Sequence, residues 1–242
     1  MKVVSLWSGG KDSCFACYKA QQQGYQVCGL INFIASDGKN SLSHGLAAEL
    51  VLKQARLTDI PVFQKAMPKE KYRDEFKAII GDWKREKGIE GVVFGDIYLT
   101  EHKDWIDKVC AEIPVKPILP LWGRDTRELI FEIINSGFKA IVVSARADLF
   151  GKESLGKRIN KEFIRGISPG IDPCGEKGEF HTFVYNGPIF NKPVEFVTKK
   201  KVLKNKHWFL EVNLKKRIKE VMWDGEKNTQ GKENRDRLSE KV

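Results

Sequence analysis

Residues 8–13, Ser-Gly-Gly-Lys-Asp-Ser, place two glycines, two hydroxyls and a lysine between a short apolar run and a segment of helical character. Glycines let a backbone approach an anion closely, and the N–H groups at a helix start form an anion-binding nest. The serines add hydroxyl donors, Lys11 adds a positive charge, and Asp12 could hold a metal ion. The segment therefore predicts a phosphate-binding loop.

The spacing of this loop separates it from two common phosphate motifs. A Walker A loop needs G-x-x-x-x-G-K-[ST] and a dinucleotide fingerprint needs G-x-G-x-x-G, and the sequence fits neither. A plain Gly-rich turn in which Asp12 caps the following helix is the competing interpretation.

The elements around the loop alternate between strand and helix signals. Apolar runs predict strands over 3–7, 26–34, 60–63, 91–94, 114–119 and 140–144. Periodicity and end signals predict helices over 12–24, 46–57, 69–87, 100–112 (capped by Thr100) and 125–135. Such alternation is typical of an α/β fold with a doubly wound, mostly parallel sheet.

Four polar clusters follow predicted strands in this pattern: residues 8–13, 32–37, 95–96 and 144–146. Ligands bind at the carboxyl ends of the strands in such sheets. We therefore expect these clusters to meet at one edge and to share a ligand.

The regular alternation of strand and helix signals becomes less clear after about residue 120. A helix is predicted over 155–167, then a Gly- and Pro-rich loop that runs into a strand, and a further strand over 202–214. We expect a first domain over 1–122, a smaller α+β domain over 123–223, and a basic, flexible tail over 224–242.

Charge and cysteine usage narrow the class of protein. The formal net charge is +10, and residues 199–242 alone carry 14 Lys/Arg against 7 Asp/Glu; this excess suits nucleic acid, an acidic protein surface or a solvated tail. No run reaches the roughly 18 apolar residues of a membrane span. The first residues enter a strand without a leader pattern, so we expect a cytoplasmic protein with no membrane partner.

Cys14 and Cys17 form a lone C-x-x-C, which we interpret as a pair of structural thiols.

Residues 8–13 resemble the PP-loop of the N-type ATP pyrophosphatases, which holds the pyrophosphate leaving ATP. Three further stretches, FGDI at 94–97, residues 101–126, and CGEKGEFHTFVYNGP at 174–188, resemble the diphthine–ammonia ligase (diphthamide synthetase) family, most of all its archaeal members. The resemblance spans about residues 1–195. It implies an adenine nucleotide alpha hydrolase-like, ATP-binding domain over 1–122 and a substrate domain over 123–223.

The resemblance also implies a reaction. The family converts the carboxylate of diphthine, on elongation factor 2, into the amide of diphthamide, with ATP and ammonium as co-substrates. Adenylation gives the carboxylate a leaving group, so the expected products are AMP and pyrophosphate. Because an anionic carboxylate must approach a polyanionic nucleotide, Mg²⁺ is expected across the phosphates.

Residue roles follow by resemblance, position by position. Asp12 and Asp96 are the candidate Mg²⁺ ligands, although a turn aspartate is the competing interpretation of Asp96. The candidate ATP-binding residues are Ser8, Gly9, Gly10, Lys11, Asp12, Ser13, Asn32, His44, Gly95 and Asp96. The candidate catalytic residues are Lys11, Asp12, Asp96, Glu176, Glu179 and His181.

The substrate end of the site is assigned to residues 174–188. Glu179 and His181 lie two apart in an extended segment and share one face, where either could hold ammonium and accept its proton. A turn bonded to its own backbone competes with this interpretation. The candidate substrate-binding residues are Trp122, Glu176, Glu179, Phe180, His181 and Thr182. Aromatic candidates for a wall against the trimethylammonium group of diphthine are Trp105, Trp122, Phe180 and Tyr185, with core packing as the alternative.

Two other functions stay open. A PP-loop enzyme that modifies tRNA would fit the basic tail, but residues 174–188 favour the ligase, so a nucleic-acid partner is disfavoured. A non-enzymatic ATP-binding module would share the loop and lack turnover. A symmetric homodimer is compatible with the sequence.

Overall fold

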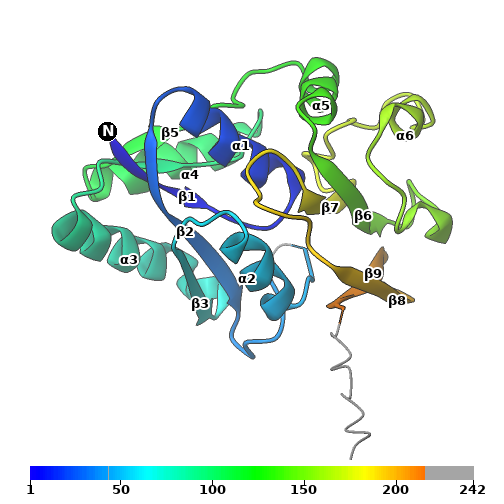
Figure 1. The fold of residues 1–242 in the computed structure, drawn as a ribbon, viewed down its shortest axis with the longest axis horizontal. Coiled ribbons are helices and arrows are strands. Elements are labelled where there is room, and N and C mark those ends of the chain that lie inside the picture. The colour runs from blue at the N-terminus through cyan, green and yellow to red at the C-terminus, as the bar shows by residue number, and fades with distance from the viewer. Residues whose placement is uncertain (43, 216–242) are drawn as a thin grey trace, which may run out of the picture.

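The computed structural model describes residues 1–42 and 44–215 of the 242. Its first layer is a parallel sheet in the order β3-β2-β1-β4-β5 (Figure 1). The strands are Lys2–Leu6 (β1), Gln26–Ala35 (β2), Val62–Met67 (β3), Gly91–Val93 (β4) and Lys116–Ile118 (β5). The chain reverses its direction of winding between β1 and β4, which is where such sheets bind ligands. The expected α/β fold class is confirmed.

Helices cover both faces of this sheet because their apolar stripes pack against two separate cores. Lys11–Gln22 (α1) and Ala48–Arg56 (α2) pack on one face, and Tyr72–Lys87 (α3) and Thr100–Glu112 (α4) pack on the other. A short 3₁₀ turn, Lys69–Lys71 (η1), precedes α3. The sheet is therefore buried on both sides, and its free polar edge is the carboxyl end of the strands.

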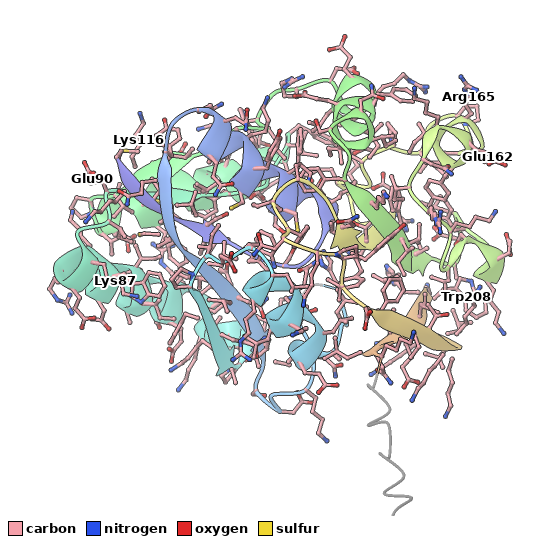
Figure 2. The ribbon with its side chains drawn as sticks, viewed as in Figure 1. Lys87, Glu90, Lys116, Glu162, Arg165 and Trp208 are labelled. Atoms are coloured by element: carbon pink, nitrogen blue, oxygen red, sulfur yellow. The ribbon has the colours of Figure 1, made fainter. Side chains whose placement is uncertain are left out.

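The second layer is an antiparallel sheet in the order β7-β6-β9-β8. Its strands are Lys139–Arg146 (β6), Phe180–Asn186 (β7), Phe196–Lys204 (β8) and His207–Leu214 (β9). Helix α5 (Thr126–Asn135) leads into this sheet. Charged side chains such as Lys87 and Arg165 lie on the outside of the two layers, while one continuous apolar core joins α1 and α2 to the second sheet (Figure 2).

The helix expected over 155–167 is wrong. A 3₁₀ turn, Lys152–Ser154 (η2), precedes this segment, and within it only the short helix Lys161–Arg165 (α6) is present. Gly156 has a φ of +84°, and Arg158 forms a bridge to Ile141 in β6. The apolar spacing that suggested a helix instead comes from an irregular segment that packs on the second sheet.

The single strand expected over 202–214 is also wrong, since this segment contains the end of β8, a turn and all of β9. β8 and β9 are joined by Asn205 (φ 49°) and Lys206 (φ 62°). Two successive left-handed residues make the tight turn that joins twisted strands. Because β8 is rich in lysine, it lacks the apolar run that would have predicted a strand.

Two cap assignments differ as well. Thr100 is the first residue of α4 and Leu99 occupies the cap position without a side-chain bond. α1 begins at Lys11 after Gly10, so Asp12 lies inside the first turn and does not cap the helix. The Asp12 carboxylate is thus available to a ligand.

Three further expectations concern the C-terminal tail, membrane-spanning segments and the cysteines. The tail expected over 224–242 lies outside the described residues. Within residues 1–42 and 44–215, no helix has both the length and the apolar character of a membrane span. The Cys14 and Cys17 thiols are free and buried in α1, and burial raises the pKa of Cys17 to about 12 and that of Cys14 well above its usual value. These thiols stay protonated, which supports a structural role.

Candidate functional site

The loop of residues 8–13 is closed by a ring of hydrogen bonds. The Gly10 N–H donates to Ser8 Oγ at 3.3 Å, the two serine oxygens Ser8 Oγ and Ser13 Oγ lie 2.9 Å apart, and Ser13 Oγ donates to the Gly10 carbonyl at 3.1 Å. Gly9 has a φ of +84°, a conformation that favours glycine. The ring fixes the loop before any ligand binds.

Residues distant in sequence fasten this loop to the second sheet. Gln54 Nε2 donates to the carbonyls of Gly9 (2.9 Å) and Val184 (2.5 Å), and the Val184 N–H donates to Gly9 O at 3.0 Å. The Lys11 N–H donates to Thr182 Oγ1 at 3.0 Å. Strand β7 therefore positions the loop, and Thr182, predicted as a substrate contact, bonds to the loop backbone.

Lys11 is buried, with 2% of its surface exposed. Its Nζ donates to Asp12 Oδ2 at 2.9 Å and to the Cys174 carbonyl, and it lies 5.4 Å from the centre of the Phe180 ring. Burial alone lowers the pKa of Lys11, but the charge of Asp12 and its hydrogen bond outweigh burial and raise the pKa above its usual value. The lysine stays charged and joins α1 to the loop before β7.

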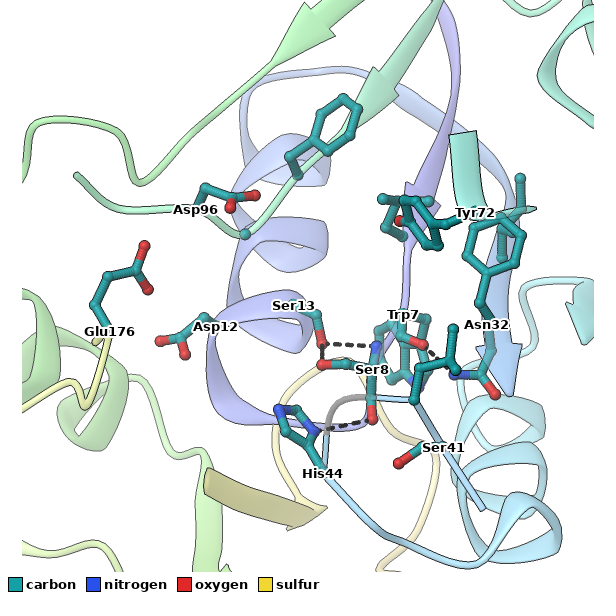
Figure 3. A pocket seen from close by; sticks show the side chains of 16 residues that line it. Trp7, Ser8, Asp12, Ser13, Asn32, Ser41, His44, Tyr72, Asp96 and Glu176 are labelled. Atoms are coloured by element: carbon teal, nitrogen blue, oxygen red, sulfur yellow. Dashed lines mark hydrogen bonds between the residues drawn. The ribbon is translucent and has the colours of Figure 1, made fainter. Parts of the chain in front are cut away.

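A cavity of about 250 Å³ opens at the carboxyl ends of β1, β2 and β4 (Figure 3). We call it the nucleotide pocket. The structure brings together most of the predicted ATP-binding residues here, and the predicted residues that line it are Ser8, Asp12, Ser13, Asn32, His44, Gly95, Asp96 and Glu176. The pocket is also lined by residues that were not predicted to belong to it, among them Trp7, Ser41, Leu42, Tyr72 and Phe94.

Three carboxylates gather on one side of this pocket, from α1, the end of β4 and the 174–188 segment. Figure 3 shows Asp12, Asp96 and Glu176 around a shared space. Glu176 Oε1 accepts from the Ile97 N–H at 2.8 Å. Burial raises the pKa of Glu176 to about 7; the Ile97 N–H opposes the rise, and the charges of Asp12 and Asp96 add to it. This side of the pocket is built to meet a cation.

Asp12 fits a role as a metal ligand. Burial raises the pKa of its carboxyl against the opposing charge of Lys11, and its Oδ1 is buried without a hydrogen-bond partner within the described part of the chain. No preassembled group of three metal-ligating side chains occurs among the described residues. Mg²⁺ commonly uses one or two carboxylates together with substrate phosphates, so the donors present suit a nucleotide-bound ion.

Two histidines cover the other side of the loop. His44 Nδ1 lies 3.3 Å from Ser8 O, and the His44 and His181 ring centres are 4.8 Å apart. Burial lowers the pKa of His44 to about 3 and that of His181 to about 4, and the charge of Lys11 acts in the same direction on both. Both rings are therefore neutral at pH 7, and the same burial and charge oppose their protonation.

Asn32 lies inside β2, not after it, and connects this strand to its neighbours. Its Nδ2 donates to Trp7 O at 2.6 Å, and its Oδ1 accepts from Gln64 Nε2 at 2.9 Å. The amide is held at the pocket wall by protein contacts.

Other predicted residues lie away from the nucleotide pocket. Phe180 is buried between Phe150 and Phe163, and Trp122 lies near Lys103. Glu179 is 6% exposed, and its Oε2 is without a partner among the described residues. Their substrate roles stay predictions.

Glu176→Gln tests the electrostatics of the three carboxylates. A carboxyl whose folded pKa is raised costs stability as it ionises, so the wild type loses stability as pH rises from about 4.5 to 7. Discounted for the partial exposure of Glu176, we expect a loss on the order of 1 kcal/mol, or about 2–4 °C in Tm. The glutamine variant keeps the Ile97 contact and lacks this loss. Parallel Tm–pH curves from thermal unfolding of the two proteins would contradict the assignment.

Comparison with known proteins was consistent along the chain. The model of the diphthamide synthase N-terminal domain matches residues 1–117, and that of the C-terminal domain matches residues 125–221. A diphthine–ammonia ligase of Danio rerio is 29% identical over 221 residues, covering 80% of this chain and 86% of that protein. The Homo sapiens ligase is 25% identical, covering 80% and 82%.

Two further matches are more partial. The chain is 26% identical to the Schizosaccharomyces pombe diphthine–ammonia ligase over 84% of its own length, and it spans 37% of that protein. A solved chain from Methanocaldococcus jannaschii, described as a predicted subunit of tRNA methyltransferase, matches 80% of this chain with a TM-score of 0.42 and 16% identity. A similarity this low supports no functional conclusion.

Proposed function

Because the chain belongs to the diphthamide synthase family, we propose that it is an ATP-dependent ligase that amidates diphthine on elongation factor 2, with ammonium as nitrogen donor. The observation that carries the proposal is the nucleotide pocket itself. The phosphate-binding loop contributes Ser8, Asp12 and Ser13 to this pocket. Asp96 and Glu176, from two other segments of the chain, add two carboxylates beside Asp12. Such a site can bind a triphosphate and a cationic co-substrate together.

The first step activates the carboxylate. A carboxylate oxygen of diphthine bonds to the α-phosphorus of ATP, and the bond from that phosphorus to the bridging oxygen breaks, which releases pyrophosphate. The N–H groups of Gly9, Asp12 and Ser13, at the start of α1, take no part in the loop contacts described above and are the donors we assign to the departing negative charge. One well-placed donor of this kind contributes about 3 kcal/mol.

Asp12 and Asp96 are the residues we propose to hold Mg²⁺. A magnesium ion held there would reduce the repulsion between the phosphates and the incoming carboxylate. Asp96 is oriented by His102, whose Nδ1 lies 2.9 Å from Asp96 Oδ1.

The second step forms the amide. Ammonium gives up a proton, its nitrogen attacks the acyl carbon, and AMP departs with the former carboxylate oxygen. Glu176 titrates near neutral pH and borders the pocket, so it can take this proton. His181 and Glu179 remain candidates for the same role, and His181 lies beside His44 at the loop.

We also propose that residues 1–122 bind ATP, that residues 123–223 bind the modified histidine, and that the reaction takes place in the cytoplasm. Support for the division comes from the two sheets, which occupy residues 2–118 and 139–214, and from the two family models, which meet between residues 117 and 125.

The test is product analysis with α-labelled ATP, Mg²⁺ and ammonium. We expect AMP only when elongation factor 2 carries diphthine, together with conversion of the carboxylate to the amide by mass spectrometry. Elongation factor 2 without diphthine is the control, and glutamine should not replace ammonium. ATP binding without AMP would favour a non-enzymatic module, and AMP formed with tRNA would favour a tRNA-modifying enzyme.

A further inference from the structure

A second, mostly apolar cavity of about 420 Å³ adjoins the nucleotide pocket. We call it the aromatic pocket and define it by Tyr72, Phe94 and Trp105 in its wall and by Asp96 and Glu101 at its acidic side. No step of the reaction described above uses Tyr72, Trp105 or Glu101. The steps described so far therefore assign no role to these three side chains.

The wall of the aromatic pocket is a cluster of rings. The Tyr72 and Trp105 ring centres are 5.5 Å apart at an interplanar angle of 44°, and Phe76 packs behind them at 5.6 Å from Trp105. Tyr72 and Trp105 are half-buried, while Phe76 and Phe94 are buried. The first two rings are thus held in place from behind and keep surface for a ligand.

The charged groups at this cavity are two carboxylates and one imidazole. Glu101 is exposed in the first turn of α4, and Asp96 shares a hydrogen bond with His102. The nearest lysine along α4, Lys103, is paired with Asp107 and sits near Trp122. Aromatic faces together with carboxylates favour a cation over an anion or a neutral base.

The aromatic pocket borders the nucleotide pocket, and this position determines where the part of the ligand attached to the cation lies. Leu6, Tyr72, Phe94 and Asp96 line both pockets. A cation in the aromatic pocket would therefore hold a group attached to it at the border of the nucleotide pocket, beside Asp96. A quaternary ammonium has no N–H to donate, so aromatic faces and nearby charge are the means of binding it.

We propose that the aromatic pocket binds the trimethylammonium group of diphthine, with Trp105 and Tyr72 as the aromatic wall and Glu101 as the counter-charge at its mouth. The proposal rests on the proposed function, since the same side chain of diphthine carries both this cation and the carboxylate to be activated. It selects Trp105 among the aromatic candidates of the sequence. Phe180 is enclosed in the core, and Tyr185 packs on Phe196.

The binding of tetramethylammonium to the full chain, measured by saturation-transfer NMR, tests the aromatic pocket without requiring the amidation reaction. We expect binding of tetramethylammonium and none of neopentyl alcohol, its uncharged analogue in shape. Trp105→Leu should weaken binding about 5-fold and Trp105→Phe less, because phenylalanine keeps an aromatic face. Glu101→Gln should weaken it about 3-fold. Asp104→Asn, an exposed carboxylate of the same helix outside the pocket, should not change it.

Two outcomes would overturn the proposal. Equal binding of the neutral analogue would show an apolar cavity without cation selectivity. Displacement of tetramethylammonium by ATP, together with weaker ATP binding in Trp105→Leu, would assign the cavity to the nucleotide base. Thermal unfolding of each variant shows whether the fold is intact, and Glu101→Gln keeps the test valid if Trp105→Leu is unstable.

Kinetics with modified elongation factor 2 separate this proposal from the reaction. Glu101→Gln should raise KM for the diphthine-bearing protein about 3-fold and leave kcat and the KM for ATP unchanged. If amidation occurs and this KM does not move, the cation site is wrong while the ligase function stands. If no amidation occurs but selective tetramethylammonium binding is seen, the ligase proposal fails and the cation site stands.

Discussion

Replacing Lys11 by methionine is expected to lower the free energy of unfolding by about 3 kcal/mol and to reduce AMP formation by at least ~10²-fold. The methionine fills similar space but leaves the Cys174 carbonyl without its donor and Asp12 without its counter-charge. Lys11 also offsets the negative charge near Glu176. The variant therefore loses the connection between α1 and the segment before β7.

The pH dependence distinguishes this mechanism from simple loss of packing. Because the pKa of Lys11 is raised, its stabilising charge persists until pH rises through that raised pKa. In Lys11→Met the unpaired carboxylates bind protons more readily, so the stability deficit should shrink as pH falls from about 7 to 5. Chemical denaturation at both pH values measures it.

Lys19→Met is the matched control on the same helix. Lys19 pairs with Glu132 at 3.0 Å near the surface, and Glu132 keeps a second partner in Arg124. This change should cost less than about 1 kcal/mol and leave AMP formation unchanged. A Lys11 variant as stable as the Lys19 variant would show that the buried cation is not needed.

The first sheet could be predicted from the sequence because its strands are buried on both faces. Their nearly continuous apolar runs, separated by helical periods, leave little ambiguity. The second sheet is different, since lysine-rich β8 pairs only along one edge and the segment after β6 has no regular period. This sheet forms when β7 and β9 pair with β6 and β8 pairs with β9, and the local sequence of each strand does not indicate these partners.

The phosphate-binding loop and the 174–188 segment could also be predicted from the sequence. The hydrogen bonds that connect the two could not. Thr182 and Gln54 bond to the loop from distant positions, and nothing local marks Thr182 for this role. Gln54 did carry a signal. It lies four residues after Leu50, on the apolar face of α2, and is fully buried. A polar residue at such a position needs partners, and here they are two backbone carbonyls.

Gly95→Ala should be nearly as damaging as the loss of Lys11, although Gly95 has no unusual backbone angle. A Cβ at this position would lie 2.9 Å from Ser13 N and 3.0 Å from the Asp12 carbonyl carbon. Both are backbone atoms of the first turn of α1, so α1 must move away from the end of β4. We expect a stability loss of about 1–3 kcal/mol, and roughly 10²-fold slower AMP formation because Asp12 and Ser13 shift.

Gly81→Ala supplies the control for this change. Gly81 lies inside α3, and the one atom outside the helix backbone that its added Cβ would meet among the described residues is an Arg85 guanidinium nitrogen, at 3.5 Å. Alanine favours a helix interior by up to about 1 kcal/mol over glycine, so this variant should be more stable than the wild type and equally active. Equilibrium unfolding and ATP titration of both variants make the comparison. The prediction fails if Gly95→Ala binds ATP and unfolds like the wild type. The close contact between α1 and the end of β4 would then be unnecessary for stability and for ATP binding, and the loop of residues 8–13 alone would position the nucleotide pocket.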